Sequence, residues 1–277
     1  MGDFWLVLQF SWVPFAGAAC YALTAAPLGA ALSLRDEILL GLALPPVGAA
    51  AIVLAVMLGV DPDSSAPLYF SAVAAILAVS LMLPGPRAQG GSVRWRAVLL
   101  AGVFCAGEAA TLLMGAASPR VEAHVHDMLR GEILAMDARE LWGFVILTAV
   151  AIAVAFRNRG LLYALALDQE GLVIKLKKRG DRAVLGFRVA SALVIAAGVI
   201  WVGPLLTLGL LAVPTLLWER RARRLNNLMT GVTAIGFLGV VLGFCVAILL
   251  DMPPVPVVIA ALFAVGGAAA VACCRRG

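Results

Sequence analysis

Long runs of apolar residues, separated by short polar segments, dominate the chain. A helix needs roughly 20 apolar residues, rising about 1.5 Å each, to cross a hydrocarbon core about 30 Å thick. By this measure the runs predict membrane-spanning helices over 5–34, 38–60, 68–83, 97–117, 141–156, 228–250 and 255–273. The remaining run, 185–218, is too long for one crossing, and Val202-Gly203-Pro204 is expected to break it into two helices. The pattern therefore predicts about nine transmembrane helices.

Composition supports this interpretation. Apolar residues make up 63% of the 277 residues and charged residues only 13%, whereas a soluble domain has about half and about a quarter. A chain this apolar cannot hide its side chains in one water-soluble core. The composition excludes a cytosolic enzyme, a disordered protein and a nucleic-acid-binding domain. It predicts an all-α, polytopic helical membrane protein whose first partner is the lipid bilayer and which binds no nucleic acid.

The basic residues predict which ends of the helices face the cytoplasm. If the N-terminus lies outside, alternation places 18 of the 21 lysines and arginines on the inner side. The other three are Arg120, Arg130 and Arg139. Excess Lys and Arg in short loops marks the cytoplasmic side. We therefore expect the N-terminus outside and the C-terminus in the cytoplasm. This assignment counts Arg35 and Arg188 among the basic residues of the cytoplasmic loops.

Two segments between the predicted spans are long enough to bind something. The outer segment, 118–140, contains His124, His126, Glu122 and Asp127, which are ligand types that zinc accepts. The alternative is an exposed polar helix that contacts a partner protein or lipid headgroups. The inner segment, 158–181, is expected to form one or two short helices along the cytoplasmic membrane surface.

The chain lacks the sequence motifs of an enzyme. It contains no Walker A pattern, no HExxH and no GxSxG. The sequence therefore predicts a protein without its own ATPase site, with no catalytic residues and with no cofactor bound by this chain.

Several short motifs, in order, resemble those of permease subunits of metal-type ABC importers, which take up zinc, manganese or iron. They are Ala26-Pro27-Leu28-Gly29, Gly131-Glu132-Ile133-Leu134, Asp168-Gln169-Glu170, and Val202-Gly203-Pro204-Leu205-Leu206 followed by Leu210-Leu211 and Pro214. The resemblance implies a single transmembrane permease domain over 1–277 that forms a homodimer in the cell (inner) membrane. It also implies a separate ABC ATPase subunit that binds ATP, and a periplasmic or surface substrate-binding protein.

The resemblance also implies roles for particular residues. Asp168, Gln169, Glu170 and Gly171 occupy the start of the family's ATPase-coupling segment; the alternative is a solvated loop. Gly203 and Pro204 fall in the motif expected to line the translocation path. The expected cargo is a divalent transition-metal ion, with zinc or manganese ahead of iron.

One departure from the family concerns the second span. That span usually carries an acidic residue and, four positions later, a histidine, on one helix face. The corresponding residues here are Leu42 and Pro46, neither of which can bind a metal. Glu108 is the only acid deep in a predicted span, and it is either a cation contact in the path or a buried glutamate that fixes packing. The predicted metal contacts are thus His124, His126 and Glu108.

This departure leaves other functions open. The cargo could be a metal chelate or another small solute carried by the same kind of permease. A membrane scaffold that transports nothing is the remaining alternative.

Overall fold

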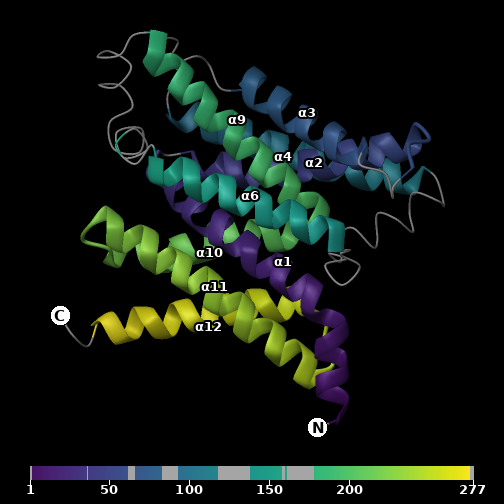
Figure 1. The fold of residues 1–277 in the computed structure, drawn as a ribbon. Helices are drawn as coiled ribbons and strands as arrows, with labels where there is room; N and C mark the ends of the chain where they lie inside the picture. The colour runs from purple at the N-terminus through teal and green to yellow at the C-terminus, as the bar shows by residue number, and fades with distance from the viewer. Residues whose placement is uncertain are drawn as a thin grey trace. The chain divides into compact units, whose positions relative to one another are not determined.

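The computed structural model describes residues 2–35, 37–61, 66–82, 93–117, 138–157, 160 and 178–274. Within these ranges the chain is helical and has no strand (Figure 1). Its α-helices are α1 (Gly2–Ser33), α2 (Ile38–Met57), α3 (Ala66–Met82), α4 (Val93–Ala116), α6 (Ala138–Arg157), α9 (Lys178–Trp201), α10 (Pro204–Trp218), α11 (Leu225–Leu250) and α12 (Pro254–Cys274). A 3-10 turn, η2 (Glu219–Arg221), follows α10. The all-α prediction is confirmed, and each of the nine predicted spans has its own helix.

The described helices differ in how well they match the thickness of a membrane. Six contain apolar stretches long enough to cross it: Trp12–Ser33, Ile38–Met57, Val98–Ala116, Arg182–Trp201, Leu225–Leu250 and Pro254–Ala272. The apolar parts of α3 and α6, Tyr69–Ala78 and Leu141–Val154, are shorter. In lipid only a helix satisfies its own backbone hydrogen bonds without water, which is why the apolar runs fold this way. The side of the membrane on which each end lies stays a prediction.

The chain contacts divide into two compact units, which we describe separately. Unit 1 comprises Met1–Ala30, Arg130–Val154 and Trp201–Gly277, and unit 2 comprises Ala31–Leu129 and Ala155–Ile200. The assignment of 1–277 to a single permease domain stays a prediction.

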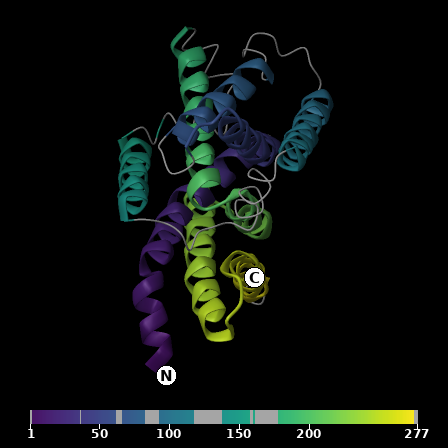
Figure 2. The ribbon, with the colours of Figure 1, turned by 90° about the vertical axis from the view of Figure 1, so that its right-hand side faces the viewer.

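In unit 1, a tight turn connects α11 to α12, and these two helices lie side by side. Helix α1 runs along α11 (Figure 2). Glycines allow the close approach: Gly243 of α11 faces the backbone of Val258, and Gly236 faces Ala26 of α1. An aromatic cluster of Tyr21, Phe144 and Trp201 joins α1, α6 and the end of α9, with ring centroids 5.4 and 4.8 Å apart. Buried aromatic pairs of this kind stabilise a core beyond their buried area.

In unit 2, α2 packs against both α3 and α4. More than half of α2 is buried, including Pro45 and Pro46, and the helix continues through both prolines. At Gly48 of α2, α3 and α9 also come close, through Ser71 and Val199. Because α2 is surrounded in this way, its position depends on contacts with several helices.

Candidate functional site

The predicted path residues of unit 2 lie where α2 crosses α4. A Cβ added at Gly107 of α4 would stand 2.9 Å from both the carbonyl carbon and the Cβ of Pro46. Pro46 is buried at this crossing, and Leu42, one turn earlier on α2, is half-buried. The crossing therefore brings α4 directly onto Pro46, one of the two positions at which the resemblance implies a metal ligand.

Glu108 follows Gly107 on α4 and is half-buried. Its neighbour Cys105, three residues earlier, is exposed. Within the described ranges no group of three or more His, Cys, Asp or Glu side chains could hold a metal ion. Glu108 is thus the residue directly after Gly107 on α4, and it belongs to no described cluster of metal ligands. Its role as a cation contact stays a prediction.

The two other predicted path residues, Gly203 and Pro204, form the break between α9 and α10 in unit 1. Gly203 has φ +93° and ψ 155°, a conformation that essentially only glycine adopts. Pro204 follows at the first position of α10, where its missing N–H costs nothing. The Thr207 hydroxyl and backbone N–H both donate to the Gly203 carbonyl, at 2.8 and 3.2 Å. The predicted helix break is confirmed, whereas its role in a translocation path is not tested.

The remaining predicted site residues fall outside the described part of the chain. These are His124 and His126 of the outer segment, and Asp168, Gln169, Glu170 and Gly171 of the inner segment. The last four residues of the inner segment, 178–181, are described, and they form the first turn of α9. The inner segment therefore leads directly into a long helix.

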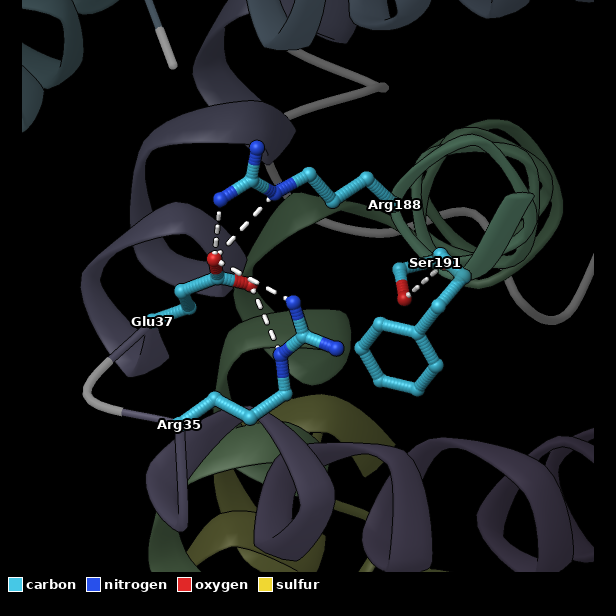
Figure 3. A network of polar contacts seen from close by, with 5 residues as sticks. Arg35, Glu37, Arg188 and Ser191 are labelled. Atoms are coloured by element: carbon cyan, nitrogen blue, oxygen red, sulfur yellow. Dashed lines mark hydrogen bonds and ion pairs between the residues drawn. The ribbon is translucent and has the colours of Figure 1, made fainter. Parts of the chain in front are cut away.

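An ionic cluster that the sequence did not predict lies at the corner between α1 and α2 (Figure 3). Arg35 donates from Nε to Glu37 Oε2 at 3.1 Å and from Nη2 to Oε1 at 3.4 Å. Arg188 of α9 donates to the same Oε1 from Nε at 3.1 Å and from Nη2 at 2.6 Å. The Arg35 guanidinium also lies over the Phe187 ring of α9, 4.5 Å from its centroid. We refer to Arg35, Glu37 and Arg188 as the charged corner.

All three charged side chains are buried, with 9% of Arg35, 3% of Glu37 and 5% of Arg188 exposed. Burial lowers the pKa of the Arg35 guanidinium, and the adjacent Glu37 carboxylate opposes that shift. Removing one partner of a buried ion pair leaves an uncompensated charge and costs about 3–5 kcal/mol. The corner therefore depends on Glu37, the single acid between two arginines.

The sequence counted Arg35 and Arg188 among the basic residues of the cytoplasmic loops and did not predict their burial. Both are buried because they share one carboxylate, and Arg188 lies well inside α9 rather than before it. One signal was present in the sequence, since Arg188 falls inside the apolar run 185–218. A charge in such a run needs a partner, but nothing in the pattern indicates that the partner is Glu37.

Comparisons with known proteins identify a family and a fold. The profile described as the ABC 3 transport family matches residues 9–270. The fold is similar to that of PsaBC from Streptococcus pneumoniae in complex with Fab, with a TM-score of 0.78 and 18% identity, over 96% of this chain and 93% of the other. It is also similar to a metal-chelate type ABC transporter in an inward-facing conformation, with a TM-score of 0.68 and 16% identity, over 91% and 84% of the two chains. A comparison with curated protein sequences finds no match.

Proposed function

Because the chain belongs to the ABC 3 transport family, we propose that it is the membrane-spanning permease subunit of an ABC importer in the cell (inner) membrane. The observation that carries this proposal is the family match, which covers residues 9–270 and so reaches every described helix. The sequence has no Walker A pattern, so a separate ATPase subunit supplies the energy. Since such an importer needs two permease halves, a second copy of this chain completes the channel.

The proposed cargo is a divalent transition-metal ion, with zinc or manganese favoured, delivered by a substrate-binding protein. His124 and His126 on the outer segment are the proposed first contacts, and Glu108 is the proposed contact within the membrane. Imidazole and carboxylate groups are ligands that such ions accept. The place of Glu108 directly after Gly107 on α4 supports this role, because Gly107 packs against Pro46 of α2.

A second candidate cargo is a metal chelate. Leu42 and Pro46 offer no ligand atoms, and no described cluster of three or more acidic, histidine or cysteine side chains compensates for them. A chelated ion brings its own ligands, so a path lined by apolar side chains would suit it better than a bare cation. This candidate keeps the same permease, ATPase and binding protein.

Reconstitution separates these candidates. The permease and its ATPase partner are placed in vesicles, and ATP-dependent uptake of radioactive zinc or manganese is measured with the binding protein present. A bare-ion permease accumulates the free ion, and His124→Ala/His126→Ala lowers that uptake; uptake equal to the wild type would remove both histidines from the path. Uptake only of chelated metal favours the second candidate. If neither form accumulates although the complex hydrolyses ATP, metal is not the cargo, and the alternatives of another small solute and of a scaffold that transports nothing are left.

The ATPase-coupling role of Asp168, Gln169, Glu170 and Gly171 has its own test. Glu170→Arg reverses one charge in this segment, and we expect it to abolish co-purification with the ATPase while leaving membrane insertion intact. Asp61→Arg is the matched control, because it makes the same change at an exposed acid after α2. Unchanged co-purification of Glu170→Arg would assign this segment to an ordinary solvated loop.

A further inference from the structure

Helices α2 and α9 meet at two levels in unit 2. At the first level Arg188 of α9 is bonded to Glu37, directly before α2. At the second, the position of a Cβ on Gly48 of α2 lies 3.5 Å from Val199 of α9. Both steps, from 37 to 48 and from 188 to 199, are eleven residues long, or about 16 Å along a helix. The two helices therefore advance in the same direction.

Glu37 holds the N-terminal end of α2 through its side chain. It occupies the N-cap position of α2, yet it makes no side-chain cap hydrogen bond. Its carboxylate instead accepts hydrogen bonds from both arginines. Because these charges are buried, the bonds are stronger than the same bonds in water. Arg35, which precedes Glu37, adds a second contact with α9 through the Phe187 ring.

The charged corner joins the two helices that lead to the two proposed functional regions. The first turn of α9 contains 178–181, the end of the predicted ATPase-coupling segment, and Arg188 lies seven residues beyond it, about 10 Å along the helix. On α2, Leu42 and Pro46 follow Glu37 by five and nine residues. A hydrogen-bonded helix is a rigid element that carries a displacement along its length.

We propose that Glu37 is a positioning residue that transmits movement of the coupling segment from α9 to α2. In this arrangement α9 moves with the segment that precedes it, and Arg188 draws Glu37 and the first turn of α2 along. Glu37 does not contact the cargo. The inference rests on the proposed function, because it takes the 158–181 segment as the place where the ATPase docks.

Variants of the charged corner test this link in the full complex in vesicles, with uptake and ATP hydrolysis measured on the same sample. Glu37→Gln is expected to lower the number of ions moved per ATP about tenfold, within the usual range of coupling between sites, while ATP hydrolysis continues. Arg188→Lys keeps the charge but loses the bidentate guanidinium donor, and it is expected to lower the number of ions moved per ATP by less than Glu37→Gln does. For the exchange Glu37→Arg/Arg188→Glu we expect more ions moved per ATP than for Glu37→Gln.

The matched control is Thr148→Val. It removes another hydrogen bond between residues distant in sequence, from the Thr148 hydroxyl to the Cys20 carbonyl at 3.0 Å, which lies in unit 1. A purely structural loss would lower the amount of complex in both variants and leave the ratio of transport to hydrolysis unchanged. We expect the ratio to fall only for the charged corner.

A second measurement does not depend on the cargo. Hydrogen–deuterium exchange in residues 33–41 is compared between the nucleotide-free and ATP-bound complexes. The wild type is expected to change its exchange on ATP binding, and Glu37→Gln to lose that response although it still binds ATP. No response in the wild type, or an equal response in Glu37→Gln, overturns the inference.

If Glu37→Gln does not assemble, Arg188→Lys decides by the same criteria. If the complex moves no metal, the proposed function fails, and the exchange data still decide the role of Glu37.

Discussion

Single glycines set the distance between helices in both units. On α4, Gly107 and Gly102 share one helix but have different surroundings. Gly107 is pressed against the backbone of Pro46, whereas nothing lies within 4 Å of a Cβ at Gly102. In α11, Gly239 and Gly243 face α12 with similarly little space. Small residues at such crossings let helix backbones approach closely in membranes.

The pair on α4 gives a matched prediction. Gly107→Ala places a methyl group 2.9 Å from Pro46 atoms, and overpacking of this kind costs about 1–3 kcal/mol. Gly102→Ala meets no neighbour, and the better helix propensity of Ala is worth up to about 1 kcal/mol. We expect the midpoint of thermal unfolding in detergent to fall for Gly107→Ala and to stay level or rise for Gly102→Ala. Equal midpoints for the two variants would contradict the close crossing of α2 and α4.

At the scale of helices, the break between α9 and α10 depends on one backbone conformation. Gly203 has φ +93°, and a side chain in this region costs about 1–3 kcal/mol. Gly203→Ala is expected to lower the free energy of unfolding by that amount. Gly186→Ala, on α9 with nothing within 4 Å of the new Cβ, is the control and should be neutral or stabilising. Denaturant unfolding followed by circular dichroism measures both, and an unaffected Gly203→Ala would show that the break tolerates other conformations.

The helices were predictable from the sequence because each one must satisfy its backbone inside lipid, so each leaves a long apolar run. Gly203 and Pro204 marked the one break inside such a run for a local chemical reason. The start of α9 was harder to predict from the sequence. The helix begins at Lys178, before the apolar run, because a helix can continue from the membrane into water, where Lys and Arg are good helix formers.

The charged corner could not be predicted for a different reason. Glu37 and Arg188 are separated by 151 positions, and no periodicity or motif links them. Each residue next to an apolar run has the ordinary interpretation of a loop charge. Only the packing of α9 beside the corner between α1 and α2 shows that the carboxylate is shared. Tertiary contacts between distant segments thus determine the chemistry that composition and spacing leave open.

At the scale of the whole molecule, the basic residues make a prediction about sidedness. The exposed residue Arg223 follows η2, whereas Asp61 follows α2 and Met252 lies in the turn between α11 and α12. The excess of Lys and Arg assigns the first to the cytoplasm and the other two to the outside. If this assignment is right, an impermeant thiol reagent will label Asp61→Cys and Met252→Cys in intact cells but will label Arg223→Cys only after the membrane is opened.

The parent for this experiment is a variant without its five native cysteines, and unlabelled parent protein is the control. The result tests each helix, because successive helices cross the membrane in alternating directions. If a helix between two labelled positions did not cross, one of them would be found on the side opposite to the predicted one. Labelling of Arg223→Cys and Met252→Cys from the same side would mean that α11 does not cross the membrane. If Asp61→Cys were labelled only after the membrane is opened, α2 would run in the direction opposite to the one predicted. The charged corner would then lie on the side of the membrane opposite to the one where the ATPase is expected to dock.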